Sequence, residues 1–169
     1  LGIQDAVEHV VQVQVPRIDK ERCTGCGRCA EFCRFNAIVS AGSVSMVFPE
    51  MCHSCGGCLL VCPEAAIKYE PRRIGVVVTG HSGNIQIVQG RLDIGVAMAP
   101  PLIRAVQKWI NRHGVVILDS PPGTSCPVIT TLQAADRLLL VTEPTPFGLN
   151  DLQLAVDVAR ELGFRPGVV

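Results

Sequence analysis

Eight of the nine cysteines stand in two short runs whose spacing suits iron–sulfur chemistry. The first run reads CTGCGRCAEFC, and its cysteines are Cys23, Cys26, Cys29 and Cys33. The second run reads CHSCGGCLLVCP, and its cysteines are Cys52, Cys55, Cys58 and Cys62. Thiolates in a C-x2-C-x2-C-x3-C run are ligands of [4Fe–4S] clusters. The two runs therefore predict two such clusters.

Disulfides and zinc are the alternative explanations for so many cysteines. A disulfide framework suits a secreted chain, and nothing in the sequence indicates secretion. C-x2-C pairs are common zinc hooks, but a tetrahedral zinc site usually takes two pairs rather than one run of four. Pro63 follows the last cysteine of the second run, as the cluster pattern expects, whereas Arg34 stands there in the first run. The spacing favours clusters over both alternatives.

An internal repeat relates the two runs. Each cysteine of the first run recurs 29 residues later, beginning with Cys23 and Cys52. Two halves that are each too small for a core are expected to pack around a pseudo-two-fold axis. Crossed ligation then follows, because the fourth cysteine of a run reaches the other cluster. The predicted ligands of one cluster are Cys23, Cys26, Cys29 and Cys62. Those of the other are Cys52, Cys55, Cys58 and Cys33.

The residues around the cysteines supply an expected scaffold. VVQVQV alternates strictly and predicts a half-buried strand, and AIVSAGSVSMVF predicts two short strands around a turn. AEF and LLV each predict a one-turn helix. Glycines that let backbone N–H groups approach sulfur stand at Gly25, Gly27, Gly56 and Gly57. Apolar side chains expected to pack against the clusters are Ile18, Ile38, Val47 and Ile67.

By these runs, residues 16–71 resemble a two-cluster bacterial ferredoxin. That resemblance implies a small α+β domain whose clusters carry electrons. His53 lies inside the second run, but the cysteine set is complete without it. We expect His53 at the surface beside a cluster rather than among its ligands.

From Arg72 onward the pattern changes to short apolar runs and amphipathic stretches. IGVVVTG, VVILDS and RLLLVTE predict strands buried on both faces, which is typical of a parallel sheet. PPLIRAVQKWINRHG and SCPVITTLQAAD predict helices, the first ending at Gly114. GLNDLQLAVDVARELG predicts another, with Asn150 as its cap and Gly163 as its stop. This alternation indicates βαβ units in an α/β layer, with Cys126 expected in its core.

Asp119 ends the predicted strand VVILD, at the edge where open α/β sheets bind ligands. An aspartate there can orient a Mg²⁺-bound water, and the following SPPGT stretch offers the N–H of Gly123 to a γ-phosphate. An aspartate after a strand can equally cap a turn. The spacing alone leaves both interpretations open.

The stretches VVILDSPPGT and ADRLLLVTEPTPFGLNDLQLAVDVARELG resemble the MinD superfamily of deviant-Walker P-loop ATPases, and RLDIGVAMAPPLIRAVQK is similar to the same group. More narrowly, the chain resembles MinD-type ATPases with an inserted two-cluster ferredoxin domain. The resemblance implies an incomplete, parallel-sheet P-loop NTPase-like layer in residues 1–15 and 72–169, interrupted by an α+β insert in residues 16–71. It also implies a catalytic role for Asp119, with Mg²⁺ or water, and a γ-phosphate contact for Gly123.

The sequence departs from that family at the phosphate site. The P-loop, a GKGGTGKT-like stretch with two lysines, is absent, and no G-x-x-x-x-G-K-S/T occurs in these residues. Without that loop no backbone cradle holds the phosphates. The chain opens on Leu1 rather than Met and stops within a β-branched run at Val169, so both ends are expected to be cut from a longer protein. We therefore expect ATP and Mg²⁺ to bind, and ATP to be hydrolysed, in the full-length protein only.

Composition narrows the function classes. Hydrophobic residues make up 48% of the 169 residues, so a packed core is expected. Lys plus Arg and Asp plus Glu number 15 each, which argues against a nucleic-acid or acidic-membrane partner. The apolar runs fall far below the ~20 residues of a spanning helix, and no signal segment opens the chain. We expect a cytoplasmic protein with no transmembrane segment.

Three functions fit these features. We favour an electron-transfer module that serves a redox partner protein and is gated or driven by ATP turnover in the full-length protein, for which a homodimer is also expected. An iron–sulfur carrier or assembly ATPase of the Mrp type needs a labile cluster, commonly shared at a dimer interface, whereas this chain supplies eight ligands by itself. A positioning or regulatory ATPase with sensory clusters is the third, and no membrane-targeting helix in these residues supports it.

Overall fold

The computed structural model describes residues 2–111 and 113–169, so Leu1 and Arg112 lie outside the described residues. The chain divides into two compact units, Leu1–Met98 and Ala99–Val169. Both four-cysteine runs belong to the first unit. Two of its strands run through the domain boundaries expected near residues 15 and 71, and the expected division into three segments stays a prediction. Within the described residues, no helix combines the length and the apolar character that crossing a membrane requires.

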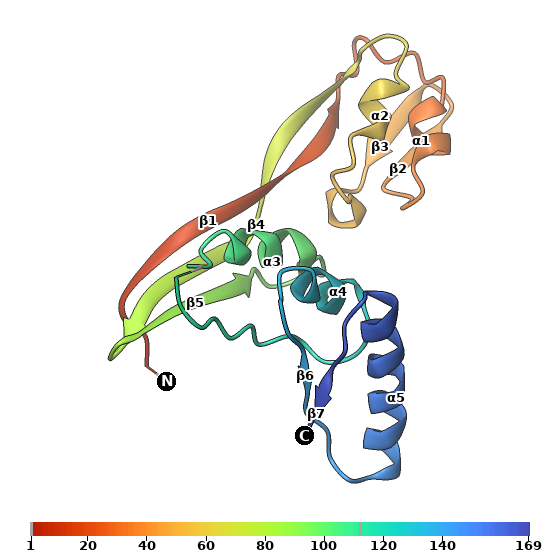
Figure 1. The fold of residues 1–169 in the computed structure, drawn as a ribbon. Coiled ribbons are helices and arrows are strands. Elements are labelled where there is room, and N and C mark those ends of the chain that lie inside the picture. The colour runs from red at the N-terminus through yellow and green to blue at the C-terminus, as the bar shows by residue number, and fades with distance from the viewer. Residues whose placement is uncertain (1, 112) are drawn as a thin grey trace. The chain divides into compact units, whose positions relative to one another are not determined.

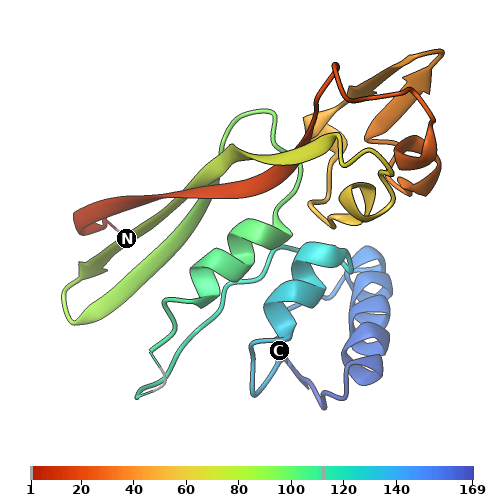
Figure 2. The same ribbon diagram turned by 90° about the horizontal axis from the view of Figure 1, so that it is seen from above.

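The first unit is built on a long antiparallel ribbon (Figures 1 and 2). Strands β1 (Gln4–Ile18) and β4 (Ile67–Ser82) pair along most of their length, and β5 (Ile85–Leu92) pairs with the far half of β4. The strand order is therefore β1-β4-β5. The Val–Gln alternation of residues 10–15 lies in β1, which confirms the predicted strand.

The expected parallel arrangement of IGVVVTG is wrong. This run is the buried centre of β4, but β4 pairs antiparallel with both of its neighbours. A continuous apolar run signals burial on both faces of a strand and carries no information about strand direction. The burial was predicted correctly, and Ile74, Val76 and Val77 are each 1% exposed.

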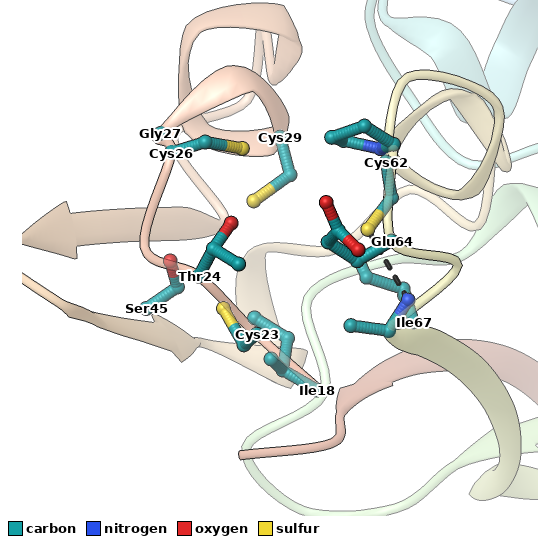
Figure 3. Close-up of a pocket in the computed structure, with 12 residues that line it drawn as sticks. Ile18, Cys23, Thr24, Cys26, Gly27, Cys29, Ser45, Cys62, Glu64 and Ile67 are labelled. Carbon is teal, nitrogen blue, oxygen red and sulfur yellow. Dashed lines mark hydrogen bonds between the residues drawn. The ribbon is translucent and has the colours of Figure 1, made fainter. Parts of the chain in front are cut away.

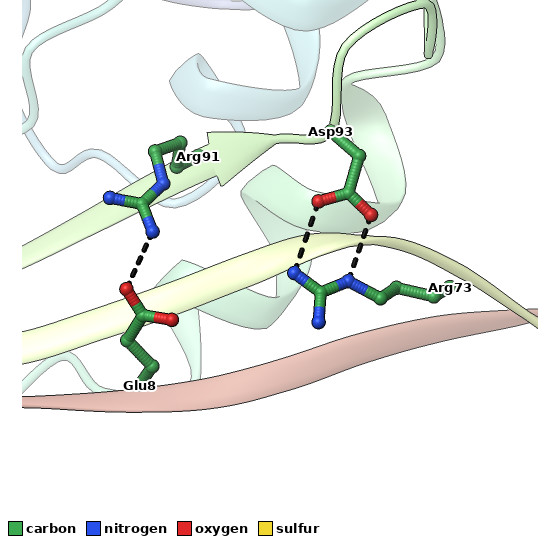
Figure 4. A network of polar contacts seen from close by, with 4 residues as sticks. All are labelled: Glu8, Arg73, Arg91 and Asp93. Carbon is green, nitrogen blue, oxygen red and sulfur yellow. Dashed lines mark hydrogen bonds and ion pairs between the residues drawn. The ribbon is translucent and has the colours of Figure 1, made fainter.

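Charged side chains join the three strands at the surface of the ribbon (Figure 4). The guanidinium of Arg73 on β4 donates two hydrogen bonds, of 2.9 and 3.1 Å, to the carboxylate of Asp93 just after β5. These bonds lower the pKa of Asp93. Arg91 on β5 pairs with Glu8 on β1 across the intervening strand. Exposed pairs of this kind contribute little to stability, but a bidentate geometry fixes the register of the strands they join.

The part of the first unit between β1 and β4 contains both cysteine runs and is called the lobe below. It has the predicted small α+β form. Two short antiparallel strands surround a turn whose glycine, Gly42, has a φ of 60°. Two one-turn helices each begin near the third cysteine of a run, and a 3-10 turn precedes the second run. In chain order the elements are α1 (Arg28–Phe32), β2 (Ile38–Ala41), β3 (Val44–Val47), η1 (Pro49–Met51) and α2 (Gly57–Leu60).

The second unit contains the three predicted helices and one small parallel pair of strands. The elements are α3 (Pro100–Gln107), α4 (Cys126–Leu132), β6 (Leu139–Leu140), α5 (Pro146–Glu161) and β7 (Gly167–Val168). Strands β6 and β7 pair in parallel over two residues each. Within the described residues no other strands pair in parallel. A P-loop NTPase-like layer therefore stays a prediction.

Three local predictions in the second unit are wrong. Residues 115–120, expected as the strand VVILDS, are not in a strand, and Val115 and Ile117 are 95% and 87% exposed. Two prolines follow this segment and cannot donate ladder hydrogen bonds. Helix α3 ends at Gln107 rather than Gly114. Beyond it the N–H groups of Trp109 and Ile110 donate to carbonyl oxygens three residues back, and Asn111 Oδ1 accepts from the N–H of His113. Cys126 is exposed at the start of α4 instead of lying in the core.

A side-chain cap begins helix α5, and a glycine with a positive φ ends it. The hydroxyl of Thr145 accepts from the backbone N–H of Gly148, so Thr145 is the cap and the expected cap at Asn150 is wrong. At the other end Gly163 has a φ of 84°, and the N–H groups of Gly163 and Phe164 donate to Arg160 and Ala159. This is a Schellman motif, which confirms Gly163 as the stop.

Replacing Gly75 tests the three-stranded arrangement. Gly75 lies on β4 opposite Leu92, and a Cβ there would overlap the carbonyl oxygen of Arg91. We expect Gly75→Ala to displace β5, at a cost of about 1–3 kcal/mol as for other overpacked sites. Hydrogen exchange should quicken at the amides of residues 85–92. Gly2→Ala, with nothing within 4 Å of its Cβ, is the control. Unchanged exchange in β5 would contradict the pairing.

Candidate iron–sulfur site

Two equivalent strand pairings bring the halves of the cysteine lobe together. Ile18 at the end of β1 pairs with Ile67 at the start of β4, and Val47 on β3 pairs with Ile38 on β2. The positions in these pairs are related by the 29-residue repeat. Each pairing therefore joins the strand that leads into one cysteine run to the strand that leaves the other run.

Backbone hydrogen bonds repeat the same relation beyond the strands. The N–H of Asp19 donates to the carbonyl oxygen of Ala66 over 2.7 Å, and the N–H of Phe48 donates to Ala37 over 2.8 Å. Both bonds cross from one half of the repeat to the other. The lobe thus has the pseudo-two-fold arrangement predicted from the sequence.

The loops between the cysteines have the same backbone conformation in both halves. Left-handed φ values occur at Gly27 (76°) and Gly56 (80°), and again at Asn36 (53°) and Ala65 (45°). Such values favour glycine, so the backbone conformation gives Gly27 and Gly56 their reason to be glycine, whereas the expected approach of their N–H groups to sulfur stays a prediction. Gly57 is required for a different reason: a Cβ at this position would overlap the ring of Phe32.

One cavity is lined by four cysteines drawn from both runs (Figure 3). These are Cys23, Cys26, Cys29 and Cys62, the first of the two predicted ligand sets. Figure 3 shows their sulfur atoms turned toward the same space. Ile18 and Ile67 line the cavity as well, together with the hydroxyl-bearing Thr24 and Ser45.

A second cavity is lined by the other predicted set. Its cysteines are Cys33, Cys52, Cys55 and Cys58. Ile38 takes the place that Ile67 has in the first cavity, in keeping with the repeat. Phe32, Ser54 and Tyr69 line this second cavity without counterparts in the first.

The third cysteine of each run is buried and the second is exposed. Cys29 and Cys58 pack in one apolar cluster with Ile38 and Ile67, and Ile18 and Val47 lie against it. The predicted packing of these four apolar side chains around the cysteines is confirmed. Cys26 and Cys55 lie at the surface, so each cavity combines a buried thiol with one thiol open to solvent.

Backbone N–H groups already point at several of the sulfur atoms. The N–H of Ala37 donates to Cys33 Sγ and that of Ala66 to Cys62 Sγ, both over 3.3 Å. The N–H of Ser54 donates to Cys52 Sγ over 3.4 Å. Donors of this kind stabilise a thiolate, and at metal centres they orient the ligand and adjust its electron density.

Burial works against the thiolate form of the inner cysteines. It raises the pKa of Cys58 to about 11, and the charges of Cys52 and Cys55 act in the same direction. Burial also raises the pKa of Cys29, against hydrogen bonds from Ala30 and Ser45 that lower it. Burial is also the main cause that raises the pKa of Cys52. A bound metal reverses this balance, because ligation deprotonates a thiol outright.

The four-thiol cavities fit a cluster better than a single ion. Zinc bonds sulfur at about 2.3 Å, so four zinc ligands converge on a point. Among the described residues, no three His, Cys, Asp or Glu side chains converge closely enough for one ion. Each set of four thiols instead lines the wall of a cavity. The residues present therefore fit a [4Fe–4S] group in each cavity.

His53 and Arg72 lie beside the second cavity in supporting positions. The ring of His53 stacks on Phe35 with centroids 3.6 Å apart and an interplanar angle of 12°, and His53 is exposed, as expected. Arg72 donates a hydrogen bond to the carbonyl oxygen of Pro49 and pairs with Glu50 at 3.5 Å, which fastens β4 to the turn before Cys52.

The nucleotide-site candidates lie in the second unit, and the structure brings them to no comparable site. Asp119 belongs to the exposed segment that was expected as a strand. Gly123 has a φ of 91° and open space around it. Their proposed roles toward Mg²⁺ and the γ-phosphate stay predictions.

Sequence reasoning missed Ser54, Tyr69 and Ser45. Ser45 is buried and shares a 2.7 Å hydrogen bond with Ser40 on the paired strand. Tyr69 lies two residues after Ile67 on β4, so the two side chains share a face of the strand. The pKa of Tyr69 is raised by burial first and then by the nearby thiolates. A superposition of the two repeats would have found Ser54 and Tyr69, because Gly25 and Ser40 stand at the matching positions.

Comparison with known proteins agrees with the geometry of the lobe. Residues 16–39 and 46–68 match the family model described as "4Fe-4S binding domain". Across 61 residues the chain is 38% identical to one subunit of the Na⁺-translocating ferredoxin:NAD⁺ oxidoreductase complex of Acetobacterium woodii, and the match covers 36% of this chain and 18% of that protein. The chain is also 36% identical over 61 residues to the pyruvate synthase subunit PorD of Thermotoga maritima, and this match covers 36% of this chain and 62% of that protein. The lobe is thus a ferredoxin-like 4Fe-4S domain.

A longer similarity extends beyond the lobe. The chain is 25% identical over 154 residues to an uncharacterized protein of Methanocaldococcus jannaschii, and the match covers 90% of this chain and 55% of that protein. The chain thus spans about half the length of this relative. The printed names of these relatives mention no P-loop ATPase, and the MinD resemblance stays a prediction.

Substituting the fourth cysteine of each run tests the crossed arrangement. We expect Cys33→Ser to damage the cluster held by Cys52, Cys55 and Cys58, because Cys33 lines their cavity. Cys62→Ser should damage the other cluster. Each variant, purified anaerobically, should lose roughly half of its iron and one of the two electron paramagnetic resonance signals.

The exposed Cys126, outside the lobe, supplies the control Cys126→Ser, which should keep both clusters. If Cys33→Ser instead removed the cluster bound by its own run, each run would ligate its own cluster.

Proposed function

We propose that this chain binds two [4Fe–4S] clusters and passes single electrons between redox proteins. The observation that carries this proposal is the pair of cavities, each lined by three cysteines of one run and the fourth cysteine of the other. Both sets lie in the lobe that matches a 4Fe-4S binding domain. Bound clusters would supply the one-electron chemistry.

The chain's own residues would hold and shield these groups. One cluster would be held by Cys23, Cys26, Cys29 and Cys62. The other would be held by Cys33, Cys52, Cys55 and Cys58. The apolar side chains of the lobe exclude water from the inner thiols, which keeps the dielectric low and contributes to the potential. The exposed Cys26 and Cys55 would offer each cluster an edge for exchange with a partner.

Two relatives support a redox protein as the partner. They are, by name, a subunit of a ferredoxin:NAD⁺ oxidoreductase complex and a subunit of pyruvate synthase. We propose by analogy that this chain works beside another redox subunit, in the cytoplasm. Permanent electron-transfer centres are favoured over a cluster carrier, because one chain supplies all eight ligands.

The finer proposal is that ATP turnover in the full-length protein gates or drives this transfer. Its support is the resemblance of residues 72–169 to the MinD superfamily, with Asp119 and Gly123 in the roles that resemblance implies. In the chain as it stands, both residues lie on an exposed segment without a P-loop. A nucleotide site would require the upstream segment of that family.

Cluster content is the direct test of the proposed function. The chain purified without oxygen should hold roughly eight irons and eight sulfides, the content of two cubanes. Its broad visible absorption should bleach on addition of dithionite and recover on reoxidation. Stoichiometric zinc without acid-labile sulfide would overturn the proposal.

A thermal melt with and without Mg-ATP tests the nucleotide proposal. A ligand raises the melting temperature only if the folded state binds it, so we expect no shift for residues 1–169. A longer protein that includes a lysine-bearing P-loop should show a rise, and Asp119→Ala in that protein should abolish ATP hydrolysis. An ATP-dependent rise for residues 1–169 would mean that the phosphate site lies within them.

A further inference from the structure

Within the described residues, the side-chain hydroxyl of Ser54 is buried without a hydrogen-bond partner. A hydroxyl that gives up water without a new partner costs free energy, so such groups are rare in folded proteins. The position of Ser54 in the loop therefore calls for a partner that protein atoms do not supply.

The backbone at Ser54 makes serine a costly choice. Its φ is 55°, in the left-handed region that glycine adopts most readily. The matching position in the first loop is indeed a glycine, Gly25, with a φ of 69°. A Cβ at Gly25 would lie 2.5 Å from the Cα of Ser43, so only the second loop has room for a side chain.

The hydroxyl sits beside a proposed cluster. Ser54 lines the cavity of Cys33, Cys52, Cys55 and Cys58. Its own N–H donates to Cys52 Sγ over 3.4 Å, which places the residue against one of the four thiols. Sulfur atoms of a cluster and its thiolates accept hydrogen bonds, and a cluster in this cavity would bring such acceptors to the lining to which Ser54 belongs.

We propose that the Ser54 hydroxyl donates a hydrogen bond to a sulfur of the cluster in the second cavity and thereby raises its reduction potential. This inference rests on the proposed function, because it requires a cluster in that cavity. Reduction adds one electron, taken from an external reductant, and places more negative charge on the sulfurs. A donor to sulfur therefore stabilises the reduced form more than the oxidised form. The hydroxyl keeps its proton, and no covalent bond changes.

The first cavity provides an internal reference. Its matching loop residue is Gly25, which offers no side-chain donor. Loss of the Ser54 hydroxyl should therefore move one potential and leave the other where it was. A general change in folding or solvation would move both.

Two variants separate the hydroxyl from the backbone. Ser54→Ala removes the oxygen and keeps the Cβ, whereas Ser54→Gly removes both and suits the positive φ. Ser43→Ala is the matched control, because Ser43 is exposed and lines neither cavity. The readout is a redox titration of the anaerobic protein with dithionite, followed by electron paramagnetic resonance, after iron and sulfide have been counted.

We expect Ser54→Ala and Ser54→Gly to lower one of the two potentials by a similar amount. An effect of about tenfold on the reduction equilibrium corresponds to about 59 mV for a one-electron couple. Two full clusters with unchanged potentials, or with both potentials shifted together, would overturn this inference and leave the proposed function standing. A chain without clusters would overturn both.

Discussion

The crossed pairing of strands at Ile18–Ile67 and Ile38–Val47 is the constraint on which the site depends. Neither cysteine run can surround a cavity alone, because the fourth thiol of each set arrives from the other half. The strand pairs hold the two halves in that exchange. Their side chains also form the apolar cluster around Cys29 and Cys58, so one set of contacts positions the ligands and excludes water.

This arrangement is stable only if something offsets its local costs. Asn36, Ala65 and Ser54 hold left-handed backbone conformations, each costing roughly 1–2 kcal/mol for a residue other than glycine. The inner thiols resist ionisation because they are buried. Metal binding is coupled to folding in small metal domains and favours the deprotonated thiol. Iron would therefore stabilise the conformation that carries these local costs.

The sequence predicted the lobe far better than the second unit, for a physical reason. Cysteine spacing and the repeat predict which residues must lie close together. The structure has two cavities, each lined by the expected four cysteines. Apolar runs state only that a segment tends to be buried. IGVVVTG was buried but paired antiparallel, and VVILDS, with Val115 and Ile117 exposed, formed no strand. Strand direction depends on neighbours that no local pattern encodes.

The repeat also explains why the two cavities cannot be assumed equivalent. It provides the same four thiols and the same loop conformation twice, so ligands alone would give two centres of similar potential. Any difference between their potentials has to come from positions where the repeat is broken. Tyr69 stands where the first half has Ser40, and Arg72 stands where it has Ser43. Both lie on the second cavity's side of the lobe, Tyr69 in its lining and Arg72 bonded to the turn before Cys52. The first cavity departs from the repeat as well, because Thr24 and Ser45 line it where His53 and Pro16 line the second. The residues that break the symmetry therefore lie at both cavities, and the cysteine pattern alone does not identify them.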